Sequence, residues 1–152
     1  MINVSVTVEK KAHTLKNNII AGLEDRQIKY LGRTWSGKVH DKKMADEEGV
    51  ILPEGYKVYR DLGFQGHDMG DGLIIMEPKK KPRGGKLMPL EKVANQDISR
   101  VRVIVEHVIS GAKRCRCAKE VFRNWRAGFG DLTMELACGL HNLRSDFRIK
   151  NY

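Results

Sequence analysis

The spacing of apolar residues changes along the chain, and this change constrains its fold more than any other feature. Residues 2–9 alternate strictly between apolar and polar side chains, which is the period of a half-buried strand. From residue 97 onward, apolar residues instead recur every three or four positions, which is the period of an amphipathic helix. Strands followed by strand–helix alternation and then by helices predict a layered α/β domain with a mixed sheet.

Further elements follow from the same patterns and from turn and capping residues. Strand-like segments, bounded by glycine, proline or aspartate, cover residues 14–21, 27–31, 56–60 and 73–76. Ser36 is predicted to be the N-cap of a short helix that runs to Glu48. Asp97 is predicted to cap a long helix that ends near Ala112. Helical spacing in the last segment is carried by Phe129, Leu132, Leu136, Leu140 and Leu143.

Length and composition set the class of protein. With 152 residues the chain suits a single domain, 1–152, and can build a real core. The fractions of apolar (41%) and charged (31%) residues are typical of a soluble globular protein and exclude a disordered or fibrous chain. The sequence contains no run of about 18 apolar residues, so no membrane span is predicted. The first residues also lack the basic and apolar regions of a signal peptide, so we expect a cytoplasmic protein.

The charge balance points to a polyanionic partner. Lysine and arginine total 28 against 19 acidic residues, which gives a net charge of +9 and favours nucleic acid, although a basic protein without such a partner is the alternative. Candidate DNA-binding residues lie at the start of a strand and in a Pro/Gly loop that could equally be a solvated loop kept for solubility: Lys10, Lys11, Lys16, Lys79, Lys80, Lys81, Arg83 and Lys86.

The three cysteines argue against a disulfide framework. Their number is odd, and Cys115 and Cys117 are only two positions apart, so we expect a reducing compartment. A zinc site built from these cysteines with His107 and His141 is a weak alternative, because the spacing fits no standard zinc-ligand pattern.

Three charged residues share one stripe of the helix predicted after Asp97. At 100° per residue, Glu106 lies about 40° and Lys113 about 20° from Arg102, opposite the apolar face. Alone, this stripe reads best as a solvated face with an Arg–Glu pair. Asp61 adds a carboxylate at the end of a predicted strand, where α/β sheets place reactive groups, although such an aspartate is often only a turn-former. An aspartate and a glutamate together could hold magnesium through their oxygens.

These residues resemble a known family. The segment Asp61-Leu62-Gly63-Phe64 resembles the D-x-G-[FY] motif of DDE transposases from bacterial insertion sequences. The spacing of Arg102, Glu106 and Lys113 matches the R-(3)-E-(6)-K element of the same enzymes at every position. Further segments that resemble the family, at residues 10–16, 77–82, 105–109 and 139–144, follow one another in the same order as in those enzymes.

The resemblance implies an RNase H-like domain that cuts and joins DNA with a carboxylate triad and two magnesium (or manganese) ions. Asp61 would be the second carboxylate and Glu106 the third, and both would be metal ligands. Arg102 and Lys113 would position the glutamate or the DNA end. Members of one subgroup carry a tyrosine where this sequence has Ser99, which indicates a different subgroup.

The resemblance also implies a missing part. The family's first aspartate lies on a first strand upstream of the segment that matches residues 10–16, and no such aspartate is found here, so we expect an N-terminally incomplete domain with its first strand truncated. This pattern fits three origins: a decayed remnant of a transposase, a downstream reading frame that is normally joined to an upstream one by frameshifting, or a domain recruited to another task.

Three functions remain open at this point. The chain could be a strand-transfer enzyme, inactive alone, that acts on transposon ends and target DNA in the nucleoid with an upstream transposase fragment, and possibly as a homodimer. It could be a non-catalytic DNA-binding module derived from a transposase. It could also be a nuclease that uses another carboxylate, such as Glu9 or Asp71, in place of the absent one.

Overall fold

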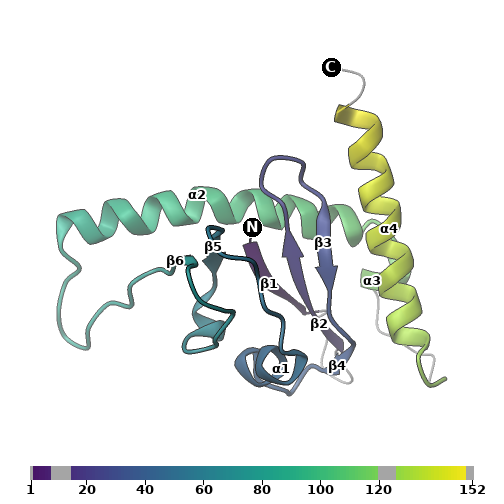
Figure 1. Ribbon diagram of the computed structural model, residues 1–152, viewed down its shortest axis with the longest axis horizontal. Helices are drawn as coiled ribbons and strands as arrows, with labels where there is room; N and C mark the ends of the chain where they lie inside the picture. Colours follow the sequence, from purple (N-terminus) through teal and green to yellow (C-terminus); the bar gives the residue numbers. More distant parts are fainter. Residues whose placement is uncertain (1, 8–14, 120–125, 150–152) are drawn as a thin grey trace.

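A computed structural model describes residues 2–7, 15–119 and 126–149, which form one mixed sheet with helices around it (Figure 1). The strands are β1 (Ile2–Thr7), β2 (Leu15–Ala21), β3 (Ile28–Leu31), β4 (Trp35–Ser36), β5 (Lys57–Arg60) and β6 (Ile74–Met76). The helices are α1 (Asp41–Glu48), the 3-10 turn η1 (Leu62–Phe64), α2 (Pro89–Ala112), α3 (Arg116–Lys119) and α4 (Phe129–Ile149). None of the described helices is long and apolar enough to cross a membrane.

The sheet has the strand order β3-β2-β1-β5-β6, and β4 pairs with β2 beside this path. The strand β2 runs antiparallel to its neighbours β1 and β3, whereas β5 runs parallel to both β1 and β6. In this register Asn3 is level with Arg60. The predicted α/β class with a mixed sheet is therefore confirmed, and the strand order is consistent with the expected RNase H-like fold.

The alternating residues 2–7 form the strand that their pattern predicted, and it lies at the centre of the sheet. Residues 2–7, whose alternation predicted a strand, pair along their whole length with β2 and also with β5. The sheet is therefore continuous at its centre. The sequence of β1 contains no acidic residue, so a strand occupies this place without supplying a carboxylate.

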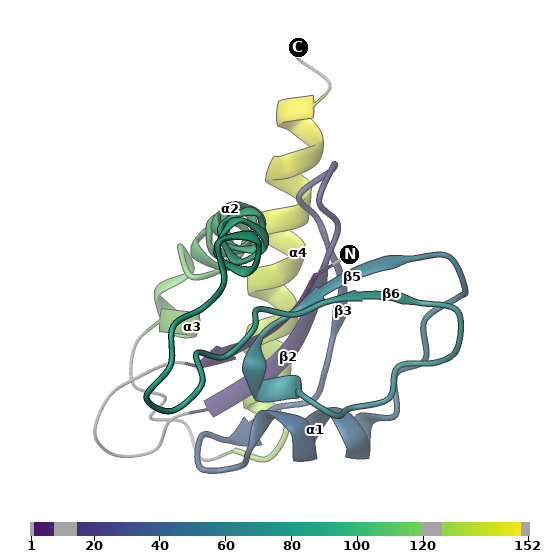
Figure 2. The ribbon, with the colours of Figure 1, turned by 90° about the vertical axis from the view of Figure 1, so that its left-hand side faces the viewer.

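Helices and loops cover both faces of the sheet. Consecutive residues of β2 are therefore buried, although they point to opposite faces. On one face, Ile19 and Ala21 of β2 pack with Val108 of α2 and Cys138 of α4. On the other face, Ile20 packs with residues that follow α1 and flank β6. Figure 2, in which α2 is seen nearly end-on, shows α2 and α1 on opposite sides of the strands. The domain is thus three layers thick, and α2 crosses the face that β1 shares with β5.

Two predicted helix starts are wrong. Ser36 lies in β4, and the N-cap of α1 is His40, whose Nδ1 accepts a hydrogen bond from the backbone N–H of Lys42. The helix α2 begins at Pro89, two turns before Asp97. Its first turns carry apolar residues at helical spacing, Leu90, Val93 and Ala94, but these are exposed, and the start is defined by a proline at the first helical position and a capping glutamate.

The helix α4 was predicted correctly, but its leucine stripe does not face the sheet. The side chains packed inward are smaller or polar: Thr133, Met134, Ala137, Cys138 and His141. The stripe that revealed the helix is exposed, with Leu136 at 57% and Leu143 at 52% of their full accessible areas. Apolar period alone therefore identified the helix without identifying its buried face.

The segment 139–144, one of those that resemble the family, fastens α4 to the edge of the sheet. The side-chain amide of Asn142 accepts from the N–H of Ile28 (2.8 Å) and donates to its C=O (2.9 Å), so it pairs with β3 as a neighbouring strand would. His141 Nε2 donates to the carbonyl of Arg26 at 2.9 Å, and Arg144 donates to the carbonyl of Gly111 at 3.0 Å. These contacts cover an edge strand that would otherwise expose unpaired backbone groups.

Candidate active site

Asp61 stands directly after β5, at the carboxyl end of this strand. Its Oδ1 accepts a hydrogen bond from the backbone N–H of Leu62 at 2.8 Å and so caps the 3-10 turn η1. Two residues after Leu62, the side chain of Phe64 is fully buried and anchors the turn to the core. The aspartate and the phenylalanine of the D-x-G-F segment thus fix the turn from its two ends, and the carboxyl group of Asp61 remains at the surface.

The glycine of this segment packs closely against a neighbouring side chain. A Cβ atom on Gly63 would lie 2.6 Å from Oδ2 of Asp41, at the start of α1. Asp41 in turn pairs with Lys16, whose ammonium is 3.0 Å from Asp41 Oδ1 and 3.2 Å from the carbonyl of Val39. Lys16 therefore connects β2 to α1 through a half-buried ion pair, and Gly63 packs against the same aspartate.

The polar stripe of α2 lies beside Asp61. Arg102 Nη2 is 3.5 Å from Asp61 Oδ2, with both side chains a little under half exposed. The opposite face of α2, represented by Ile98 and Val105, is buried. The structure thus brings together two residues 41 positions apart that the sequence analysis linked through the motifs of one family. Because the pair is well solvated, its direct contribution to stability is small.

Glu106 lies one helical turn beyond Arg102 on the same stripe. Its side chain is exposed and has no hydrogen-bond or ion-pair partner within the described residues. Lys113, the last residue of the R-x3-E-x6-K element, is the C-cap of α2 and is partly buried. An unpaired carboxylate next to an Arg–Asp pair is available for a cation.

The donors at this place fit one hard divalent cation. Magnesium is commonly held by one or two carboxylates, with water and substrate phosphates as its other ligands. Asp61 and Glu106 offer such oxygens, although each oxygen of Asp61 already has one partner. Within the described residues, no three His, Cys, Asp or Glu side chains come together as a metal site. A second ion, which needs a carboxylate shared between two metals, has no such ligand in this part of the chain.

Other carboxylates do not fill that role where the structure describes them. Asp71 precedes β6, and because β5 and β6 are parallel it lies at the opposite end of the strands from Asp61. Glu77, which the sequence analysis did not single out, follows β6 and so lies at the same end as Asp61. Its Oε1 is bound by the buried side chain of Arg60. Glu9 lies outside the described residues.

The predicted DNA-binding residues fall into three groups. Lys10 and Lys11 lie outside the described residues, and Lys16 is engaged by Asp41. Lys79 pairs with Glu91 at 2.9 Å, and Asn95 binds both its backbone N–H and its C=O, so this end of the loop is held against α2. The exposed members of the loop without a partner among the described residues are Lys80, Lys81, Arg83 and Lys86.

The cysteines form no metal site with the histidines in the described part of the chain. All three are free thiols, and Cys138 is buried. Burial, with a smaller contribution from nearby Cys115, raises the pKa of the Cys138 thiol to about 11. A thiol that stays protonated at neutral pH is a poor metal ligand and nucleophile, so Cys138 serves the core.

Comparison with known proteins gives a consistent result. Residues 4–142 match a family described as DDE superfamily endonuclease. The chain is 34% identical over 134 residues to a protein of Microchaete diplosiphon named "Probable transposase for insertion sequence element IS702". This match covers 86% of the present chain and 46% of that protein, so the chain spans about half the length of the curated relative. No solved structure matches the chain significantly.

Proposed function

Because this chain belongs to the DDE superfamily endonucleases, we propose that it takes part in DNA transposition as part of the catalytic domain of an insertion-sequence transposase. The observation that carries the proposal is the pairing of Asp61 with Arg102, one turn from Glu106. It supports a site in which the motif aspartate and the motif glutamate face the same place from β5 and α2.

In this proposal each residue has a distinct task. Asp61 and Glu106 hold a magnesium or manganese ion, which when bound polarises a phosphodiester and lowers the pKa of an attacking water or hydroxyl. Arg102 neutralises Asp61 through the ion pair seen in the structure, and its guanidinium would also be placed to bind a DNA phosphate at this site. Lys113, two turns further along the stripe, contacts the backbone of the DNA end.

Within the described residues only Asp61 and Glu106 offer carboxylates to the candidate site, because Glu77 is bound by Arg60. This supports the further proposal that the chain is inactive by itself. Two-metal phosphoryl transfer needs a ligand between the ions, and loss of one ligand of such a group typically costs several orders of magnitude in rate. The same observation favours the second candidate function, a non-catalytic DNA-binding module that keeps the fold and the basic surface.

A plasmid-nicking assay tests both statements. We expect the 152-residue chain to bind supercoiled DNA but to leave it intact with magnesium or manganese. Metal-dependent nicking that disappears in both Asp61→Ala and Glu106→Ala would contradict the inactivity and reveal a further carboxylate, with Glu77→Gln, at the same end of the strands as Asp61, as the first variant to examine. Absence of any DNA binding would contradict the transposition proposal and the DNA-binding module alike.

A further inference from the structure

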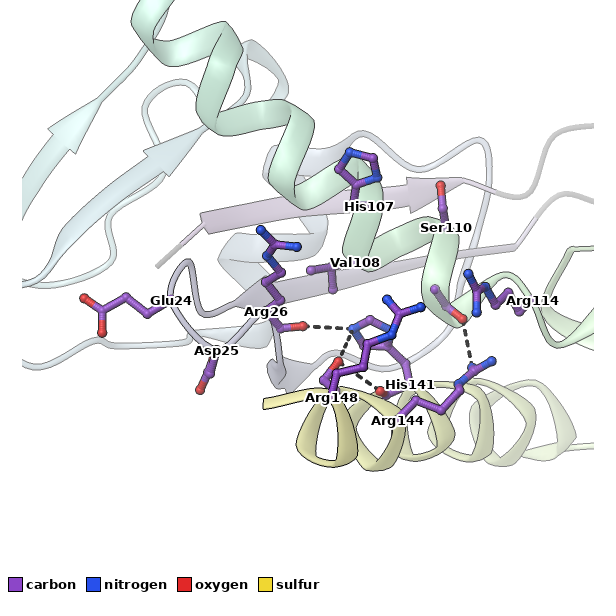
Figure 3. A pocket seen from close by; sticks show the side chains of 12 residues that line it. Glu24, Asp25, Arg26, His107, Val108, Ser110, Arg114, His141, Arg144 and Arg148 are labelled. Carbon is purple, nitrogen blue, oxygen red and sulfur yellow. Dashed lines mark hydrogen bonds between the residues drawn. The ribbon is translucent and has the colours of Figure 1, made fainter. Parts of the chain in front are cut away.

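A cavity of about 660 Å³ lies away from the candidate active site, and arginines dominate its wall (Figure 3). Three separate parts of the chain form it: the turn between β2 and β3, the end of α2 with the turn that follows it, and the C-terminal half of α4. Each contributes at least one arginine to the lining, namely Arg26, Arg114, Arg144 and Arg148. Four guanidinium groups around one hollow indicate an anionic ligand, because arginine is the side chain best suited to phosphate recognition.

The wall of this cavity is held in place by contacts already described. His141, which is 8% exposed, inserts between the β2–β3 turn and α2, and donates to the carbonyl of Arg26. Arg26 is the only described residue other than glycine with a positive φ, 54°. Arg144 donates from Nη2 to Gly111 and from Nε to Leu140, so this guanidinium is fixed and neutralises part of the negative C-terminus of α2.

The other three arginines are available to a ligand. Within the described residues, the side chains of Arg26, Arg114 and Arg148 are exposed and have no hydrogen-bond or ion-pair partner. Two acidic residues also line the hollow, but Asp25 is paired with Lys29. In Figure 3, Glu24 and Asp25 point away from Arg114 and Arg148, which lie on the side toward the end of α2. The basic side of the pocket is therefore not compensated by carboxylates.

The pocket and the candidate active site share one helix. Ser110 of the pocket wall follows Glu106 by four residues, about 6 Å along the axis of α2 and about 40° around it, and Arg114 lies in the turn directly after this helix. Successive phosphates of one DNA strand advance by about 3.4 Å along the duplex axis. A strand with one phosphate at Glu106 would therefore carry, a few nucleotides away, a phosphate within reach of the arginines.

We propose that this arginine pocket, defined by Arg26, Arg114, Arg144 and Arg148, binds backbone phosphates of the DNA that flanks the scissile position. The inference rests on the proposed function for the identity of its ligand, and it adds a contact that orients DNA along α2. The pocket reads phosphate and not base sequence, because guanidinium groups around a backbone carry no information about base edges. Arg114 and Arg148 make the contact, whereas Arg144 supports the wall.

The test is a salt titration of DNA affinity, with fluorescence anisotropy of a labelled duplex oligonucleotide of random sequence. Each lost phosphate contact makes the plot of log affinity against log salt shallower by about 0.9, so the Arg114→Ala/Arg148→Ala variant should be shallower than the wild type by about 1.8. Arg114→Lys/Arg148→Lys keeps the charge and should keep most of the slope. The matched control is Lys38→Ala/Lys43→Ala, which removes two exposed charges elsewhere; its slope should equal that of the wild type.

Two results would overturn the inference. One is a slope for Arg114→Ala/Arg148→Ala equal to that of Lys38→Ala/Lys43→Ala, when circular dichroism shows that both variants are folded. The other is weakening of inorganic phosphate binding in this variant while its DNA titration is unchanged, which would assign the pocket to a free anion. Manganese binding by the same variants separates failure of this inference from failure of the proposed function. If manganese still binds through Asp61 and Glu106 but the salt slope of the arginine variant is unchanged, only the pocket inference fails. If the slope becomes shallower but the chain binds no manganese, the pocket inference stands and the proposed metal site fails.

Discussion

Two glycines, both inside helices, should respond to alanine in opposite directions. A Cβ on Gly111 of α2 would lie 2.6 Å from Cε1 of the buried His141 ring and closer still to its Nδ1. A Cβ on Gly139 of α4 would meet nothing within 4 Å, and this position is exposed. Because the chemical change is the same, the pair isolates the effect of packing between α2 and α4.

The magnitudes follow from opposing effects. Alanine at Gly139 stabilises the fold by about 0.5–1 kcal/mol, because it lowers the entropy of the unfolded chain and favours the helix. At Gly111 that gain is offset by overpacking, which costs about 1–3 kcal/mol. If the ring of His141 moves away, its hydrogen bond to Arg26 is also lost, at about 1 kcal/mol. We therefore expect a net loss of about 1–3 kcal/mol for Gly111→Ala.

Urea denaturation followed by circular dichroism measures these changes, with His141→Ala as a second background. In that background the ring is absent, so Gly111→Ala should become neutral or slightly stabilising. The reasoning would be refuted if Gly111→Ala and Gly139→Ala changed the free energy of unfolding by the same amount. It would also be refuted if removal of His141 left the cost of Gly111→Ala unchanged.

Three further predictions concern single side chains. Asn142→Ala should lower the free energy of unfolding by about 2–3 kcal/mol in urea denaturation, because the backbone groups that it pairs with on β3 lose their partners; a change below 0.5 kcal/mol would contradict this. Burial, and then neighbouring Glu48, raise the pKa of Tyr30 to about 12, so stability should fall as pH rises from about 10 to 12, and Tyr30→Phe should remove that fall. Iodoacetamide at pH 8 should modify exposed Cys117 well before Cys138, whose pKa is about 11; equal rates by mass spectrometry would show that Cys138 is not buried.

Local patterns in the sequence predicted the parts of the site that depend on neighbours in the chain. Asp61 and Phe64 act within one turn, and the strand-end position of Asp61 indicated where the carboxylate would stand. The stripe of α2 follows from helical period, and the structure brings its Arg102 beside Asp61. In each case a short-range rule, a capped turn or 100° per residue, determines the geometry.

Features that depend on packing between distant segments were not predictable in the same way. The exposed leucines of α4 have the more regular period, yet the smaller side chains around Ala137 allow the close approach to the sheet. The arginine pocket joins Arg26, Arg114 and Arg148 from three separate parts of the chain, and no spacing in the sequence relates them. The start of α2 at Pro89 was missed although Leu90, Val93 and Ala94 continue its helical spacing, because Asp97 inside the helix was interpreted as its cap.

Manganese binding tests the central claim most directly, which is that Asp61 and Glu106 together hold a divalent cation. Electron paramagnetic resonance of free manganese, titrated with the chain, counts bound ions without any need for catalysis. We predict one weak site that is lost in Asp61→Asn and equally in Glu106→Gln, and that is retained in Asp71→Asn, whose carboxylate lies at the other end of the strands. Binding that is absent in the wild-type chain, or that survives both substitutions, would contradict the assignment of these two residues to one site.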